Sequence, residues 1–213
     1  AFPGGEPGRM SESDLRRMRL EFGGLVDRVW RFNLEPNFAE DGVELEEAWI
    51  GADLPFGALL MLGRMKEPFG AEEMTPRKRL DFPEYSQLNR WSPAEDHGVT
   101  LFGEAAGGRV WYGVAAYNGT GGDEVNDDKD VAARLAWRPR GAPAADGARP
   151  FLQLAANATW GVAEQDLAGA ELFQDARQPF ADFEPGARLD GTRVRLGADF
   201  TWLAGPNALM VEA

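Results

Sequence analysis

The sequence predicts an all-β protein, an antiparallel transmembrane β-barrel of which about ten strands are visible. Three observations lead to this prediction. Apolar and polar residues alternate over segments of about ten residues, the length of a tilted strand that crosses a bilayer. Short and long connections roughly alternate along the chain, as they do in outer-membrane barrels. The 213 residues include 26 glycines and seven tryptophans, and 11% are aromatic, which suits such strands.

The alternation is clearest in residues 129–138, 151–160 and 191–203. In the last of these segments one face is apolar, with Val194, Leu196, Ala198, Phe200 and Trp202. The opposite face carries Arg193, Arg195, Gly197, Asp199 and Thr201. Each of the three segments has a tryptophan late in the strand, where an aromatic girdle would meet the lipid headgroups. These segments are therefore predicted to be membrane-crossing strands.

The first half of the chain is predicted to follow the same scheme, with a less regular pattern. Further strands are expected at residues 17–22, 30–35, 43–51, 58–66, 97–105 and 109–118, and a last one from about Asn207. Short turns are expected at residues 23–24, 52–55, 105–108 and 204–207. Long loops are expected at residues 36–42, 67–96, 119–128, 139–149 and 163–190.

The composition excludes several classes of function. There are 22 Lys and Arg residues against 35 Asp and Glu, a net charge of −13 that argues against a nucleic-acid partner. The absence of cysteine excludes disulfides and thiol chemistry, and the single histidine, His97, is expected to be structural. Adjacent carboxylates such as Glu46 and Glu47 point to opposite faces of a strand and cannot cooperate. The chain is not expected to be an enzyme, to have catalytic residues, or to need a cofactor or metal.

The polar faces of the predicted strands are rich in arginine. A pore lined by such residues concentrates anions from the bulk solution. Alternatively, these arginines pair with carboxylates across strands and brace the wall. For Lys66 the choice is between touching permeating anions and pairing with Glu67 or Glu46. A soluble β-sandwich, such as a carbohydrate-binding module, shares much of this composition, but its exposed aromatic faces would form too large a patch for a soluble monomer.

Three motifs follow one another in the first two thirds of the chain. Residues 45–70 read LEEAWIGADLPFGALLMLGRMKEPFG, in which one strand ends at Gly51 and the next leads to Lys66, Glu67, Pro68 and Phe69. Residues 14–35 form the preceding hairpin, which opens with DLRRMRL. Residues 96–119 form the next hairpin, which contains WYGVAAYNG. In this order and spacing, residues 14–138 resemble the phosphate-selective porin O and P family.

The resemblance implies a 16-stranded barrel in the outer membrane of a Gram-negative-type bacterium. Its partners would be outer-membrane lipid and lipopolysaccharide, small anions such as phosphate, and two further copies in a homotrimer. Residues 1–213 are expected to be one β-barrel domain, incomplete at both ends, because 16 strands need roughly 350–400 residues. The expected function is passive diffusion of small solutes with anions favoured. The alternative is a structural barrel that anchors or braces an envelope assembly without conducting.

The resemblance also implies that residues 67–96 fold into the lumen and narrow the pore. This loop carries the cluster from Pro76 to Arg79. The residues predicted to line the pore or contact anions are Arg64, Lys66, Arg77, Lys78, Arg79, Arg90, Arg134, Arg193 and Arg195. The acidic stretch at residues 123–130 is interpreted as a solvated loop. Calcium binding is the alternative, although the stretch lacks the spacing of an EF-hand.

Overall fold

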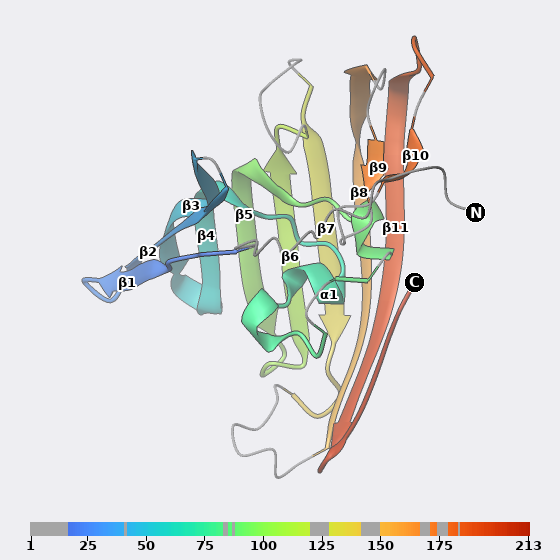
Figure 1. The fold of residues 1–213 in the computed structure, drawn as a ribbon. Coiled ribbons are helices and arrows are strands. Elements are labelled where there is room, and N and C mark those ends of the chain that lie inside the picture. Colours follow the sequence, from blue (N-terminus) through green and yellow to red (C-terminus); the bar gives the residue numbers. More distant parts are fainter. Residues whose placement is uncertain are drawn as a thin grey trace, which may run out of the picture.

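The computed structural model describes residues 17–40, 42–82, 85–86, 88–119, 128–141, 150–166, 171–173, 179–182 and 184–213. Within these residues, ten strands form one antiparallel sheet in the order β1-β2-β3-β4-β5-β6-β7-β8-β11-β12 (Figure 1). The predicted all-β, antiparallel class is confirmed, with ten strands in this sheet. β1 and β12 form its two edges. None of the described helices is long and apolar enough to span a membrane.

Most strands of the sheet are 8 to 17 residues long. Their bounds are β1 (Phe22–Val26), β2 (Trp30–Glu40), β3 (Gly42–Leu54), β4 (Ala58–Lys66), β5 (Glu95–Ala105), β6 (Val110–Tyr117), β7 (Asp130–Trp137), β8 (Phe151–Asp166), β11 (Arg188–Ala204) and β12 (Asn207–Glu212). β9 (Glu171–Phe173) and β10 (Pro179–Asp182) form a separate pair. The helical pieces are η1 (Pro55–Gly57), α1 (Ala71–Met74), η2 (Arg77–Arg79) and η3 (Leu88–Trp91).

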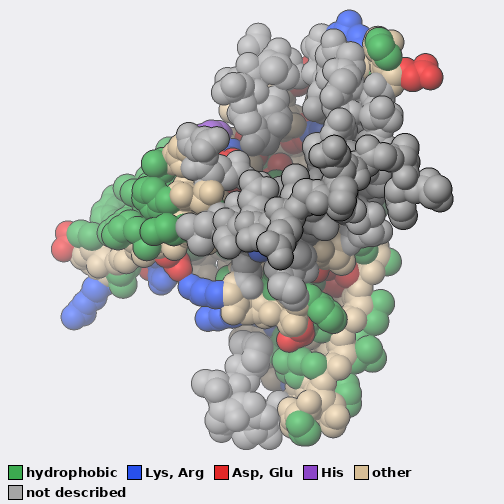
Figure 2. Space-filling model, in the orientation of Figure 1, with side chains coloured by type: hydrophobic (Ala, Val, Ile, Leu, Met, Phe, Trp, Pro, Cys, Tyr) green, Lys and Arg blue, Asp and Glu red, His purple; other side chains and the backbone are tan. Residues whose placement is uncertain are grey.

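The two faces of the sheet differ in burial, as the alternation predicted. On β7 the side chains of Ala132 and Ala136 are 2% and 1% exposed, whereas Val131 and Leu135 are 47% and 57% exposed. The buried positions define the inner face of the sheet, and the exposed apolar positions define the outer face. Figure 2 shows apolar side chains gathered along the outer side at both lateral margins of the molecule. Such an outer face suits contact with lipid.

The turn predicted at Gly23 and Gly24 is wrong. Both glycines lie within β1, and the hairpin turns at residues 27–29, where Asp27 and Arg28 have φ values of 52° and 59°. Gly24 is needed for close approach: a Cβ there would lie 2.8 Å from Cε1 of Phe32 on β2. Gly24 therefore leaves room for the Phe32 side chain of the paired strand and does not form the turn of the hairpin.

The long loop predicted at residues 36–42 is also wrong. β2 continues to Glu40 and β3 begins at Gly42. Pro36 is accommodated because the pairing of β2 with β3 shifts register between Glu35 and Pro36. A bulge of this kind tolerates a residue without a backbone N–H group. A regular strand position needs a backbone N–H that proline lacks, and the bulge removes that need.

The long loops near the end of the chain need two corrections. β8 extends to Asp166, β11 begins at Arg188, and the β9–β10 pair lies between them, so residues 163–190 are not one loop. The long connection between β7 and β8 also lies at the end of the sheet that carries the short turns, because Val110 pairs with Trp137. The expected alternation of short and long connections therefore holds only in part.

A small apolar core covers part of the inner face. Met61, Met65, Ala115, Tyr117 and Ala132 form this cluster, with Trp49, Leu59 and Phe102 packed against it. Tyr117 is 1% exposed and shares a hydrogen bond with the hydroxyl of Thr100, while its own hydroxyl donates to the carbonyl of Lys66 at 3.0 Å. The core therefore fixes the point at which the chain leaves β4.

Candidate functional site

The chain between β4 and β5 crosses the inner face of the sheet. Its described residues, 67–82, 85–86 and 88–94, are called the interior segment below. Glu67 and Phe69 are buried directly after β4, with exposed fractions of 3% and 7%. Figure 1 shows α1 lying over the sheet and not beyond its end. The segment thus occupies the space that the sheet curls around.

On one side, the interior segment is tied to the last strands of the sheet. The backbone N–H of Gly70 donates to Oδ1 of Asn157 on β8 at 3.3 Å. The N–H groups of Ala71 and Glu72 donate to Oε2 of Glu212 on β12, at 3.1 and 2.9 Å. One carboxylate therefore holds the first turn of α1 against the far wall.

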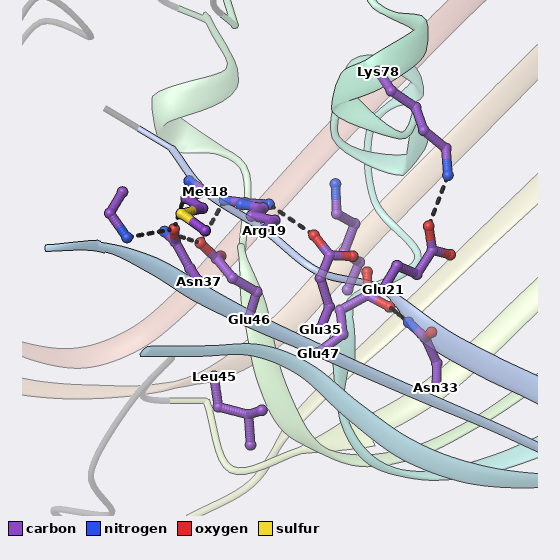
Figure 3. Close-up of polar contacts among 12 residues, drawn as sticks. Met18, Arg19, Glu21, Asn33, Glu35, Asn37, Leu45, Glu46, Glu47 and Lys78 are labelled. Carbon is purple, nitrogen blue, oxygen red and sulfur yellow. Dashed lines mark hydrogen bonds and ion pairs between the residues drawn. The ribbon is translucent and has the colours of Figure 1, made fainter. Parts of the chain in front are cut away.

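On the other side, two lysines tie the segment to the first strands. Nζ of Lys66 donates to the carbonyl of Glu73 at 2.7 Å and lies 3.3 Å from Oε1 of the same residue. Lys66 also donates to the hydroxyl of Tyr85 at 2.9 Å. Nζ of Lys78 pairs with Oε2 of Glu21, just before β1, at 2.7 Å (Figure 3). The segment therefore has contacts with residues near both edges of the sheet.

The inner face of β2 and β3 carries a network of paired charges (Figure 3). Arg19 lies 2.5 Å from a carboxylate oxygen of Glu46 and 3.3 Å from one of Glu35. Glu47 accepts hydrogen bonds from Asn33 at 3.3 Å and from the indole N–H of Trp49 at 3.1 Å. The carboxylates of this wall are thus held by nearby donors. Glu46 and Glu47 are predicted to point to opposite faces, but the register shift leaves Glu46 at the bulge and both contribute to this network.

Two wall arginines lie in buried ion pairs. Arg134 on β7 is 2.6 Å from Asp199 on β11, and the two side chains are 4% and 1% exposed. Arg193 on β11 is 2.5 Å from Asp130 on β7 and also donates to the carbonyl of Gly119 at 2.8 Å. Both pairs bridge across the intervening strand β8. This arrangement matches the bracing alternative for these two arginines.

Glu67 lies among opposite charges beneath the interior segment. Burial raises the pKa of Glu67 to about 8, and the neighbouring carboxylates of Asp130 and Asp96 contribute to the rise. Arg195 and Arg193 act in the opposite direction. Nη1 of Arg195 is buried and has no hydrogen-bond partner among the described residues. Buried nitrogens of Arg134 and Arg193 also lack a hydrogen-bond partner, but these two arginines have carboxylate partners, whereas Arg195 has no ion pair among the described residues.

The remaining predicted site residues have different environments. Arg64 alternates with the buried Met61 and Met65, which places it on the outer face, and its Nε donates to the carbonyl of Leu45 at 2.9 Å. Lys66 pairs with Glu73 and with neither partner expected for it. Arg79 is exposed and has no ion pair among the described residues. The side chains of Arg77 and Arg90 lie outside the described part of the structure.

Two chambers lie between the interior segment and the wall. The polar chamber, about 730 Å³, is lined by Arg19, Arg31, Glu35, Glu47, Lys66 and Lys78, among others. The apolar chamber, about 720 Å³, lies against β6, β7, β8, β11 and β12 and includes Trp111, Phe151 and Arg134. Lys78 faces the first chamber and Arg79 the second, so adjacent cations serve opposite sides of the segment.

Sequence reasoning missed the acceptors that hold the interior segment in place. Glu212, Asn157 and Glu73 give no local signal, because their partners lie on other elements of the fold. Most of the acidic stretch 123–130 lies outside the described residues. Among the residues that are described, no group of three or more His, Asp or Glu side chains is arranged to hold a metal.

The family model for phosphate-selective porin O and P matches residues 2–213 of the chain. The chain belongs to this family of outer-membrane β-barrel channels, as its motifs indicated. Membership indicates a channel and not an enzyme. A search among curated proteins gave no match.

Proposed function

We propose that this chain forms part of a channel through which small solutes, anions above all, diffuse passively past the interior segment. Residues 67–96 act as the constriction loop. The observation that carries this proposal is the pair of neighbouring cations on that segment. The Lys78 side chain is 64% exposed and lines the polar chamber, while Arg79 is exposed beside the apolar chamber.

The predicted cations divide into two groups under this proposal. Arg134 and Arg193 brace the wall, because their charges are compensated by buried carboxylates. Lys78, Arg79 and Arg195 contact permeating anions, because Lys78 and Arg79 are exposed beside a chamber and Arg195 has no ion pair among the described residues. Arg77 and Arg90 share the loop with them and are assigned the same role. A few exposed cations raise the local anion concentration without binding so tightly that exit becomes slow.

The proposed setting is a closed barrel of about 16 strands in the outer membrane of a Gram-negative bacterium. The support is that, among the described strands, β1 and β12 each have one edge without a neighbour, since an unpaired backbone N–H or C=O costs several kcal/mol in lipid. Lipid and lipopolysaccharide would contact the outer face. Three such barrels would assemble as a homotrimer.

A planar-bilayer recording of the protein extracted from outer membranes tests this function. We expect a reversal potential that reports anion selectivity across a KCl gradient, and a chloride conductance that falls when phosphate is added. A cation-selective reversal potential would contradict the proposal. A folded barrel with no conductance would instead support the structural alternative.

Matched variants test the role of the two cations. The double variant Lys78→Gln, Arg79→Gln is expected to lower the anion-to-cation permeability ratio by about twofold to tenfold, because it removes two exposed positive charges from the pathway. Arg28→Gln is the control, since Arg28 is exposed on the β1–β2 turn. Equal effects of the two changes would exclude a special role for Lys78 and Arg79.

A further inference from the structure

The apolar chamber has a lining that a pathway for inorganic ions does not need. Apolar side chains line it from both sides, including Met74, Leu80 and Phe82 of the interior segment and Trp111, Phe151 and Met210 of the wall. Phe82 is 74% exposed although it faces the side of the sheet that lies away from lipid. Apolar surface that is left exposed to water in a concave site is typical of ligand pockets.

The charges of this chamber are nearly balanced. Arg79, Arg134 and Arg138 line it together with Glu72, Asp81 and Glu212. Most of these charges already have partners. Arg134 pairs with Asp199, and Arg138 lies 2.8 Å from Glu104. A ligand with several negative charges would therefore gain little here.

The two chamber glutamates are held by donors of the interior segment. Glu72 accepts hydrogen bonds from the backbone N–H of Ser86 at 2.8 Å and from its hydroxyl at 2.5 Å. Glu212 accepts from Ala71 and Glu72. Asp81 and Arg79 are the exposed charges, and neither has an ion pair among the described residues. Arg79 is thus the cation of the lining that can bind a single carboxylate.

We propose that the apolar chamber binds small aromatic monocarboxylates, with the ring against Phe82 and Trp111 and the carboxylate at Arg79. This inference rests on the proposed channel function and assigns a solute class to one of its two chambers. The volume of about 720 Å³ leaves room for such a solute and its hydration water. Weak, partly apolar binding would let the solute leave again, as permeation requires.

The test uses the native protein in a planar bilayer and three probes that separate the ring from the charge. Benzoate carries both, acetate has the carboxylate alone, and benzyl alcohol has the ring alone. We expect benzoate to reduce chloride conductance at a concentration about tenfold lower than acetate, because it also buries a ring. Benzyl alcohol should be intermediate. Equal potency of acetate and benzoate would overturn the proposal, and equal potency of benzyl alcohol and benzoate would overturn the role of Arg79.

Two variants locate the effect in the chamber. Phe82→Ala should weaken the benzoate block by about threefold to tenfold and leave the phosphate block unchanged. Phe56→Ala is the matched control, because Phe56 is 96% exposed on the distant η1 turn. If both variants behave alike, the chamber is not the site. Arg79→Gln should weaken benzoate but not benzyl alcohol.

A second readout separates this proposal from the channel function. Quenching of tryptophan fluorescence by benzoate, with Trp111→Phe as the reference, reports occupancy of the chamber without any current. Quenching that disappears in Trp111→Phe supports the chamber even if the protein proves not to be anion-selective. Unchanged quenching in Trp111→Phe refutes the chamber while leaving the reversal potential as an independent test of the channel.

Discussion

Burial on the inner face of the sheet changes the ionisation of Glu67. Its carboxyl group is buried at the base of the interior segment, and its pKa is raised to about 8 from an ordinary value of 4.5. The folded protein therefore holds a proton that the unfolded chain loses above pH 4.5. It follows that ionisation of Glu67 acts against folding, and that its cost grows with pH between about 4.5 and 8.

The corresponding prediction is a difference in pH dependence. The stability of the native protein, relative to Glu67→Gln, should be greatest below pH 4.5 and should fall as the pH rises to about 8. Thermal unfolding midpoints in detergent across this range measure the difference. Glu44→Gln is the control, since Glu44 is exposed on β3. A constant difference between native protein and Glu67→Gln at all pH values would contradict the predicted ionisation.

The buried pair of Arg134 and Asp199 gives a second prediction. Asp199→Asn leaves a buried guanidinium without its counter-ion and should lower the free energy of unfolding by about 3–5 kcal/mol. Urea unfolding in lipid vesicles measures this loss. Asp53→Asn is the comparison, because its pair with Arg31 is partly exposed and should contribute less than about 1 kcal/mol. Similar losses in both variants would mean that Arg134 finds another partner.

At the scale of the strand, the sequence predicts which face a side chain lies on better than it predicts individual side-chain contacts. Period-two alternation placed Arg134, Arg193 and Asp199 on the inner face because every residue of a regular strand obeys the same geometry. Arg64 is predicted on the same polar face, but the burial of Met61 and Met65 places it on the outer face, and its role as a pore residue stays a prediction. The irregular places, such as the bulge at Pro36 and the true turn at Asp27 and Arg28, depend on the partner strand. Local pattern therefore could not reveal them.

Gly161 on β8 shows how one strand leaves room for the side chain of another. A Cβ at this position would lie 1.6 Å from Oδ1 of Asp130, which is paired with Arg193. Gly161→Ala should therefore displace Asp130 and lower the free energy of unfolding by about 2–4 kcal/mol. Gly42→Ala is the control, because a Cβ there meets nothing within 4 Å. Urea unfolding of both variants measures the difference, and equal stability would contradict the proposed packing.

At the scale of the whole molecule, family and fold class followed from the sequence, whereas the fixing of the interior segment did not. The motif ending in Lys66, Glu67, Pro68 and Phe69 indicated where the segment begins. Its holding contacts come from Glu212, Asn157 and Glu21, which are distant in the chain. Such contacts exist only once the sheet has curled, and no local pattern encodes them.

Glu212 gives a prediction at this scale. Glu212→Ala removes the acceptor of two backbone N–H groups, at a cost of about 1–3 kcal/mol for each unsatisfied donor. The first turn of α1 should then move more freely, and single-channel recordings should show more frequent current fluctuations. Glu44→Ala, a change on an exposed part of β3, should leave the current steady. Steady current in Glu212→Ala would mean that the contacts of Lys66 and Lys78 hold the segment unaided.

The hydrogen bonds to Glu212 also constrain the order in which the protein assembles. They join Ala71 and Glu72 to a residue 141 and 140 positions later, so they form only after β12 has paired with β11. Contacts of such sequence separation are late and slow to form. These two bonds are therefore among the last contacts of the segment to form, whereas the contact of Lys66 with Glu73, seven residues away, can form early. Under the proposed channel function, the pore would reach its final selectivity only after the last strand has joined the wall.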